Sequence, residues 1–344
     1  MSNFAGLYSK LPDGRKHRLC DIIPLEMPLT LYVDPTNYCN FRCAFCPRSF
    51  EDFTKYAGNY QHMNIELFKK IVFEIYEWGR VKSLKFYYLG EPFIHPAYMK
   101  MLRMAVDYNI AERIEITTNG SLLTSEISKE LIELSNIYKG DIYLRFSIYS
   151  VIQEKHEQIT KSPILIEKIW KNIKGLKNIR DMSGNKKIFL YAKMINTFSN
   201  ENEIFLNMYR EIVDEVVIEQ PMNWSGYDER KLLQNVYNDE QLLNVAASNV
   251  RKACAYPFYT LAITPDGDVV CCCVDWSRMT KVGNVKKQSL KEIWTGEALR
   301  QFQFCHLQGR RRTNAACKNC EILHNLHEMD NIDEVSPENF LARA

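Results

Sequence analysis

The sequence has no long hydrophobic run and no large excess of charge of either sign. No segment of its 344 residues approaches the roughly 18 uninterrupted apolar residues of a membrane span, so we expect no contact with a membrane. The 44 basic and 42 acidic side chains leave a net charge of +2, which provides no basic footprint for nucleic acid. Residues 1–20 lack the apolar core and cleavage site of an export signal, so we expect a cytoplasmic protein.

The sequence also lacks internal repeats, low-complexity segments, Ser-His-Asp triads and paired carboxylates. Its 46% hydrophobic and 25% charged residues are typical of a globular protein and exclude a disordered chain or a fibre. At roughly 150 residues per domain, the length allows about two domains, or one α/β barrel with an appendage. Either can bury a large core without covalent cross-links.

Eleven cysteines are the feature that this ordinary profile does not explain. In a reducing compartment, an odd number of thiols is better explained by metal binding, clusters or catalysis than by disulfides. Three of them lie at Cys39, Cys43 and Cys46, seven lie beyond residue 250, and Cys20 stands alone.

Short β-branched or aromatic runs alternate with longer amphipathic stretches between about residues 28 and 220, which is typical of repeated βα units. The candidate strands are 29–33, 83–89, 113–117, 141–148, 187–195 and 215–220, and the candidate helices are 64–78, 98–109, 124–138, 163–179 and 201–213. Six parallel strands with intervening helices predict an α/β fold, either a partial (β/α)6 TIM-like barrel or an open doubly wound sheet. Both place ligands at the carboxyl ends of the strands.

The pattern changes after residue 220 to a polar connecting segment and then, from Cys254, to a short hairpin. Its sequence is FYTLAIT-PDGD-VVCCCV, in which PDGD is a strong turn signal. Ser289 is the expected N-cap of a following helix. The expected units are an N-terminal extension at 1–27, a barrel at 28–220, a connecting segment at 221–253, a small β-hairpin plus helix domain at 254–330 and a C-terminal tail at 331–344.

The first three clustered cysteines, in CNFRCAFC, follow directly after the first candidate strand. Thiols at Cys39, Cys43 and Cys46 can hold three irons of a 4Fe–4S cluster and leave the fourth iron without a protein ligand. The alternatives are a zinc site completed by a distant residue such as His62, or three ordinary core thiols.

CNFRCAFC resembles the cluster loop of the radical S-adenosylmethionine (radical SAM) superfamily, and the resemblance covers nearly the whole chain. It implies that the three cysteines bind a 4Fe–4S cluster and that Phe45 lies beside the adenine of SAM. Leu89-Gly90-Glu91-Pro92 is similar to the family's GGE segment, with Leu in place of the first Gly. That segment implies that Gly90, Glu91 and Pro92 bind the methionine amino group.

Three further residues match positions that contact SAM in the family. Asn119 belongs to TTNGSLLT after the third strand, and Ser147 and Lys193 end the fourth and fifth strands. Each has an ordinary alternative, since Asn119-Gly120 is a good turn, Ser147 can bond local backbone and Lys193 can be a solvated charge. The shared register favours the functional interpretation, because these segments follow successive strands and meet at one rim.

The resemblance implies reductive cleavage of SAM to a 5′-deoxyadenosyl radical, which takes a hydrogen atom from an unactivated C–H bond of a small-molecule substrate. The electron comes from a donor such as flavodoxin or ferredoxin. The cofactor performs the difficult step, while the protein positions the substrate and excludes water.

The later cysteines resemble the auxiliary-cluster region called SPASM, or its shorter Twitch form. Cys254, twelve residues, Gly267, four residues and Cys272 fit the family's spacing, and Cys317-x-x-Cys320 follows. The absence of a cysteine after 320 departs from a full SPASM domain and implies one auxiliary 4Fe–4S cluster, ligated by Cys254, Cys272, Cys317 and Cys320. A zinc ribbon with the same hairpin and CxxC is the alternative.

The choice of Cys272 rests on the glycine spacing, because strand alternation would place Cys271 and Cys273 together on the opposite face. The unassigned thiols are expected to be small buried hydrophobes, or one of them donates a hydrogen atom to a substrate radical. Cys305 is the candidate donor, near the run Arg310–Arg312, which is a solvated face or grips an anion.

Two outcomes of the radical chemistry stay open, dehydrogenation through the auxiliary cluster and epimerisation through a thiol. We expect a sugar, aminocyclitol or nucleotide-sugar substrate. The alternatives are modification of a ribosomal peptide or protein side chain, and a non-catalytic Fe–S or zinc binding protein.

Overall fold

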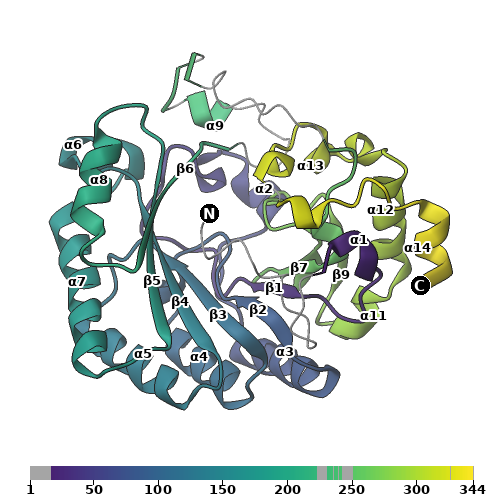
Figure 1. The fold of residues 1–344 in the computed structure, drawn as a ribbon, viewed down its shortest axis with the longest axis horizontal. Coiled ribbons are helices and arrows are strands. Elements are labelled where there is room, and N and C mark those ends of the chain that lie inside the picture. The colour runs from purple at the N-terminus through teal and green to yellow at the C-terminus, as the bar shows by residue number, and fades with distance from the viewer. Residues whose placement is uncertain are drawn as a thin grey trace.

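The computed structural model of the protein describes residues 17–222, 231–234, 236–238, 240–241, 251–325 and 327–343. Most of the expected connecting segment at 221–253 lies outside these residues, as do residues 1–16 of the expected N-terminal extension. Within the described residues, one sheet of nine strands runs through the molecule in the order β6-β5-β4-β3-β2-β1-β7-β8-β9 (Figure 1).

The first six strands are parallel and neighbour one another in chain order. They are β1 (Thr30–Val33), β2 (Val81–Lys85), β3 (Ala111–Thr118), β4 (Asp141–Ile148), β5 (Ile188–Ile195) and β6 (Glu215–Glu219). Their outer face is covered by α3 (Ile65–Trp78), α4 (Tyr98–Asp107), α5 (Ser125–Ile137), α7 (Ile166–Met182) and α8 (Glu201–Tyr209) (Figure 1). The predicted partial barrel is confirmed, because a doubly wound sheet would reverse its strand order at a switch point.

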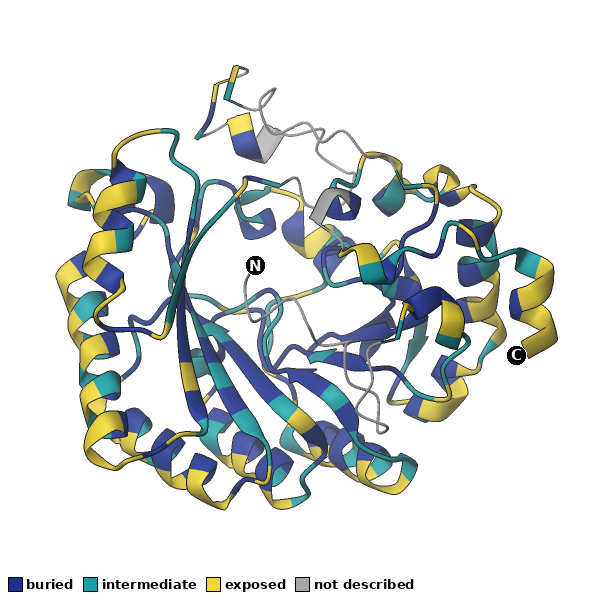
Figure 2. Ribbon diagram, viewed as in Figure 1, coloured by how far each residue is buried: buried dark blue, intermediate teal, exposed yellow. Residues whose placement is uncertain are grey.

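Alternation along β4 shows how the two faces of the barrel wall differ. Ile142, Leu144 and Phe146 are fully buried against the outer helices, whereas Arg145 and Ser147 are half-buried and point to the interior. The helices complement this surface with an apolar stripe of their own and expose their outer faces (Figure 2). The apolar core therefore lies between strands and helices, and the inner wall is left free for polar side chains.

The loops after the strands differ from the expectation in two places. The second strand ends at Lys85 and not at residue 89, so residues 86–91 form a loop at the barrel rim. A helix that the sequence pattern did not reveal, α6 (Gln153–Thr160), follows β4. Its sequence QEKHEQIT has few apolar residues, which is why its periodicity gave no signal.

The C-terminal hairpin continues the barrel sheet, which the expectation of a separate small unit did not anticipate. β7 (Thr260–Ile263) pairs in parallel with β1, and β8 (Asp268–Val270) and β9 (Lys281–Asn284) add antiparallel strands. The turn between β7 and β8 is the predicted PDGD, with Gly267 at a φ of +89°. The hairpin is thereby fixed rigidly to the edge of the barrel.

Helices surround this hairpin and close the C-terminal part of the molecule (Figure 1). An apolar cluster of its own joins the two ends of the described chain, with Leu19 and Ile23 packing with Phe258 and Phe340. The remaining helices are α1 (Leu19–Ile22), α2 (Phe53–Ala57), α9 (Lys231–Gln234), α11 (Leu290–Trp294), α12 (Glu297–Leu307), α13 (Ala315–Lys318) and α14 (Pro337–Arg343), with 3-10 turns at Pro47–Ser49, Pro92–Ile94, Tyr256–Phe258, Arg311–Thr313, Ile322–Asn325 and Glu328–Asp330.

None of the helices within the described residues has the length and apolar character that crossing a membrane requires.

Replacing Ser289 tests the predicted start of α11. Ser289 and Glu292 form a reciprocal capping box, with the Glu292 N–H donating to Ser289 Oγ at 3.2 Å and the Ser289 N–H donating to Glu292 Oε2 at 2.7 Å. We expect Ser289→Ala to lower the free energy of unfolding by about 1 kcal/mol, because one helix donor loses its acceptor. Urea unfolding of the full chain measures this. Ser289→Thr keeps the hydroxyl, and an equal loss in that variant would contradict the capping role.

Candidate functional site

A cavity of about 270 Å³ opens at the carboxyl ends of the barrel strands. All of the residues predicted to hold the first cluster and SAM line it, with the exception of Pro92. These are Cys39, Cys43, Phe45, Cys46, Gly90, Glu91, Asn119, Ser147 and Lys193. Segments that are up to about 150 residues apart in the chain therefore meet at one place, as parallel strands of a barrel require.

The cysteine loop is held in place by hydrogen bonds to its backbone. Arg48 donates to the Phe41 carbonyl at 2.9 Å, and the Ser49 hydroxyl donates to the Cys43 carbonyl at 2.6 Å. The backbone N–H groups of Arg42 and Ala44 donate at 2.8 Å to carbonyls at the end of α6. The helix that sequence reasoning missed is thus a support of the cysteine loop.

Of the three cysteines of this loop, Cys43 is buried and the other two are half-buried. Burial raises the pKa of Cys39 to about 12 and raises the pKa of Cys43 and Cys46 as well. Thiolates at this place therefore need strong positive charge beside them, which iron supplies. The donor set fits a cluster with three cysteine ligands.

The loop after β2 packs tightly against the loop after β1. A Cβ atom on Gly90 would lie 1.9 Å from the Thr36 carbonyl oxygen, so no other residue fits there without displacing backbone. The next residue, Glu91, donates its N–H to the Tyr38 carbonyl at 2.8 Å. The absence of a side chain at Gly90 thereby allows the segment Gly90-Glu91-Pro92, called the GEP segment below, to lie beside the cysteine loop.

Glu91 joins this segment to the end of β3. Its carboxylate accepts hydrogen bonds of 2.7 Å from the Thr118 hydroxyl and from the Asn119 N–H. Burial raises the pKa of Glu91 to about 7. The Asn119 side chain in turn donates to Asn40 Oδ1 at 2.9 Å, inside the cysteine loop. One network therefore connects all three segments that resemble the SAM-binding motifs.

Aromatic rings form the wall beside the cysteines. Phe45 lies 5.5 Å from Tyr149 between ring centroids, and Phe41 lies 6.1 Å from the same ring. Both Phe45 and Tyr149 line the cavity. This wall offers a flat apolar surface of the kind that a purine ring contacts.

Ser147 and Lys193 are register partners on β4 and β5, and both face the cavity. Lys193 is not a solvated charge, since its ammonium group lies 2.6 Å from Glu219 at the end of β6. Arg145 reaches the same carboxylate at 3.3 Å and donates to the Tyr87 hydroxyl at 3.1 Å. Sequence reasoning missed Arg145, Glu219 and Tyr87, although Arg145 precedes Ser147 by two and so shares its face of the strand.

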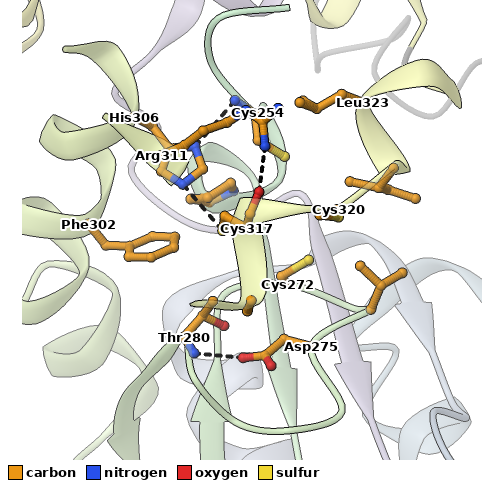
Figure 3. Close-up of a pocket in the computed structure, with 14 residues that line it drawn as sticks. Cys254, Cys272, Asp275, Thr280, Phe302, His306, Arg311, Cys317, Cys320 and Leu323 are labelled. Atoms are coloured by element: carbon orange, nitrogen blue, oxygen red, sulfur yellow. Dashed lines mark hydrogen bonds between the residues drawn. The ribbon is translucent and has the colours of Figure 1, made fainter. Parts of the chain in front are cut away.

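A second pocket lies between the hairpin and the C-terminal helices (Figure 3). The predicted auxiliary ligands Cys254, Cys272, Cys317 and Cys320 all line it, together with apolar residues such as Val274. The pKa of all four thiols is raised. Burial is the largest cause at Cys254, Cys317 and Cys320, whereas at Cys272 a hydrogen bond with Cys273 has the largest effect and burial the second largest. Four thiols around one pocket, two of them buried and two half-buried, fit a cluster without an open iron.

At neither place are the sulfur atoms arranged as the ligands of a mononuclear zinc ion. Sulfurs around a tetrahedral zinc lie about 3.8 Å apart, given a Zn–S distance of about 2.3 Å. Among the described residues, neither set of cysteines contributes three ligand atoms that all lie within 4.8 Å of one another. The wider spacing suits a polynuclear cluster.

His306 and Arg311 complete the second pocket, and sequence reasoning missed both roles. The His306 ring is buried and accepts the Cys254 N–H at 3.2 Å through Nδ1, while Nε2 lies 3.8 Å from Cys317 Sγ. The sequence predicted that Arg311 lies on a solvated face or binds an anion. It is instead 6% exposed and donates to the Cys317 carbonyl at 2.6 Å, whereas Arg310 and Arg312 are exposed.

The three consecutive cysteines do not continue the strand, because β8 ends at Val270. The alternation that placed Cys271 and Cys273 on one face therefore does not apply. Cys271 is buried in the main core and contacts the Thr280 carbonyl at 3.5 Å, whereas Cys273 packs beside Cys272 and next to Tyr32. Of the three, Cys272 lines the second pocket.

The remaining two thiols line neither of the two pockets. Cys305, the candidate hydrogen-atom donor, sits on α12 with Sγ 3.4 Å from the Arg310 carbonyl, and it does not line the barrel cavity. Cys20 on α1 donates to Glu334 at 3.0 Å. The structure does not bring Cys305 within reach of a molecule bound in the barrel cavity.

Two family models match the chain. The model described as "Radical SAM superfamily" matches residues 33–185, and the model SPASM, described as "Iron-sulfur cluster-binding domain", matches residues 254–321.

Curated relatives match most of the chain. The tungsten-containing aldehyde ferredoxin oxidoreductase cofactor-modifying protein of Pyrococcus furiosus is 28% identical over 80% of this chain and 83% of its own length. The S-adenosyl-L-methionine-dependent 2-deoxy-scyllo-inosamine dehydrogenase of Niallia circulans is 20% identical over 84% of this chain and 90% of its own.

Solved structures share the fold. BtrN in complex with AdoMet and 2-DOIA has a TM-score of 0.54 and 16% identity, covering 86% of this chain and 93% of that chain. Streptococcus suis SuiB bound to its precursor peptide SuiA has a TM-score of 0.57 and 18% identity, covering 93% and 76%.

Gly90→Ala tests the close approach of the two loops. We expect SAM affinity to fall by roughly tenfold or more, about 1.4 kcal/mol, because the added Cβ displaces the backbone that carries Glu91. Equilibrium dialysis with SAM measures this. Gly175→Ala is the matched control, since nothing lies within 4 Å of its Cβ. Equal affinities in the two variants would contradict the assignment of this loop.

Proposed function

The chain belongs to the radical SAM superfamily, carries a SPASM domain and uses 4Fe–4S clusters and SAM, and from this premise we propose that it dehydrogenates a small polar substrate. The proposed ligands of the first cluster are Cys39, Cys43 and Cys46, and those of the auxiliary cluster are Cys254, Cys272, Cys317 and Cys320. When bound, SAM and the first cluster supply a radical that takes a hydrogen atom from an unactivated C–H bond.

The cavity residues divide into a half for SAM and a half for the substrate. Gly90 and Glu91 present backbone and carboxylate acceptors for the methionine amino group, and the Phe45 ring offers a surface for the adenine. Asn119 keeps the GEP segment attached to the cysteine loop through Asn40. Ser147 supplies a hydroxyl on the β4 side of the same cavity.

The opposite wall supports a polar substrate. Tyr87, Arg145 and Glu219 line the cavity and are held by one another, and Lys193, which we propose contacts SAM, also pairs with Glu219. Such a wall matches hydroxyl or charged groups on a ring, because an apolar molecule would displace water from its polar atoms without forming hydrogen bonds to them. A sugar, aminocyclitol or nucleotide-sugar suits it.

One contact carries the preference for dehydrogenation over epimerisation. Tyr88 lines the barrel cavity, and its hydroxyl donates to the Cys272 carbonyl at 3.4 Å, beside the second pocket. A single side chain therefore connects the substrate cavity with the proposed auxiliary cluster. This connection supports the auxiliary cluster as the acceptor of an electron from the substrate, and so does the finding that the candidate hydrogen-atom donor Cys305 does not line the cavity.

The relatives are consistent with this proposal. One of them is named as a SAM-dependent dehydrogenase of an aminocyclitol, and it matches over 84% of this chain. Another is named as a cofactor-modifying protein.

Single alanine variants of the later cysteines test the auxiliary ligands. We expect Cys254→Ala, Cys272→Ala, Cys317→Ala and Cys320→Ala each to hold less iron than the wild type, by up to about four irons per chain, because the auxiliary cluster loses one of its four thiolate ligands. Iron and sulfide analysis after anaerobic reconstitution measures this. Cys271→Ala and Cys273→Ala are controls in the same segment and keep full iron. Loss of iron in Cys273→Ala with retention in Cys272→Ala would reverse the assignment.

Product analysis tests the reaction itself. The dithionite-reduced protein is expected to form 5′-deoxyadenosine from SAM, and the Cys39→Ala/Cys43→Ala/Cys46→Ala variant to form none. With deuterated candidate sugars and aminocyclitols, deuterium is expected in 5′-deoxyadenosine together with a ketone or aldehyde product. Incorporation of one solvent deuterium into a product of otherwise unchanged mass would show epimerisation instead. Modification of a peptide substrate, with every small molecule inert, would overturn the proposed substrate class.

A further inference from the structure

Two buried side chains that carry nitrogen atoms, His306 and Arg311, line the second pocket. His306 comes from the last turn of α12, and Arg311 begins the 3-10 turn Arg311–Thr313 (Figure 3). Their exposures are 1% and 6%. Burial of a histidine and a guanidinium beside four thiols is costly, so their partners indicate what they do.

The hydrogen bonds of His306 determine which ring nitrogen carries the proton. Nδ1 lies 3.2 Å from the backbone nitrogen of Cys254, which is a donor, so Nδ1 is the acceptor in this pair. A neutral ring then carries its proton on Nε2, which lies 3.8 Å from Cys317 Sγ. His306 therefore donates an N–H to the sulfur of a proposed cluster ligand while its other nitrogen is held by the backbone of a second ligand.

Arg311 places a positive charge on the same side of the pocket. One guanidinium nitrogen donates to the Cys317 carbonyl at 2.6 Å, which fixes the side chain against the segment Cys317–Cys320. Arg311 lines the same pocket as the four proposed ligand thiols. Its positive charge therefore lies on the wall of the place where the auxiliary cluster would be held.

The hydrogen bond from His306 and the positive charge of Arg311 both favour the reduced, more negative state of a cluster that these sulfurs bind. A hydrogen bond to a ligand sulfur and a nearby cation stabilise an added electron, and they are established determinants of the reduction potential of iron–sulfur clusters. We propose that His306 and Arg311 raise the reduction potential of the auxiliary cluster so that it accepts an electron from the substrate radical. This inference rests on the proposed function.

The step balances without a further oxidant. The substrate radical, formed when a hydroxyl-bearing carbon loses its hydrogen atom, gives one electron to the auxiliary cluster, its hydroxyl O–H bond breaks to give one proton to solvent, and its C–O bond becomes C=O. That electron equals the one consumed when SAM is cleaved to methionine and 5′-deoxyadenosine. SAM is therefore the net oxidant, and the auxiliary cluster passes the electron on.

The test is an EPR-monitored redox titration of the full-length, anaerobically reconstituted protein. His306→Leu removes the donor, and we expect the equilibrium constant for reduction of the auxiliary cluster to fall about tenfold, which is about 59 mV for one electron. The first cluster, in the barrel, should be unchanged. His306→Gln keeps an N–H donor and should lie close to the wild type.

Phe302→Leu is the matched packing control. Phe302 lines the same pocket and its ring lies 4.7 Å from that of His306, but it makes no hydrogen bond to sulfur. An equal shift in Phe302→Leu, or no shift in a fully iron-loaded His306→Leu, would overturn the inference. Arg311→Met should lower the potential independently.

A measurement on the wild-type protein covers the case in which His306→Leu does not retain the cluster. With ¹⁵N-labelled histidine, pulsed EPR of the reduced auxiliary cluster should show coupling to one histidine nitrogen. Absence of that coupling would overturn the inference. A wild-type protein that holds only the barrel cluster would instead refute the proposed function, so the two failures are distinguishable.

Discussion

The pairing of β1 on both of its edges is the constraint on which the rest of the structure depends. Thr30 and Leu31 are in register with β2 on one side and with β7 on the other. The cysteine loop leaves the carboxyl end of this doubly held strand, while β7 continues into the hairpin that carries Cys272. Because hydrogen bonds fix β1 from both sides, the barrel cavity and the second pocket keep a constant separation. A chemistry that passes an electron between two places requires such a frame.

The inner wall of the barrel is polar where a closed TIM barrel is filled with branched apolar side chains. Lys85 and Arg113 surround Glu115 below the cavity, and Arg145 and Lys193 hold Glu219 at its rim. Buried charges are tolerated when they are paired, and removing one partner strands the other. The wall therefore resembles a preorganised binding surface, because its ion pairs offset the free-energy cost of burying its charges before any ligand binds.

The local features were predictable because they depend on neighbours in the chain. The strand–loop placement of Cys39, Cys43 and Cys46, the turn at Gly267 and the capping box at Ser289 all follow from spacing of a few residues. The missed features depend on distant partners. The sequence near Arg145 does not indicate that Glu219 is its partner. The run Arg310–Arg312 likewise does not indicate that its middle residue is buried and the other two are exposed. The short, polar α6 was likewise hidden, since its support of the cysteine loop is a tertiary contact.

The sequence by itself determined the βα repeat, the two groups of cysteines and the family to which the chain belongs, because periodicity and motif spacing are written along the chain. Only the tertiary structure decided that the hairpin extends the barrel sheet, that Cys272 and not Cys273 lines the second pocket, and that Cys305 lies away from the barrel cavity. It also decided the contacts of His306 and Tyr88. The physical reason is that a side chain's burial, partners and direction are set by segments that pack against it from far along the chain, and these are known only once the sheet is assembled.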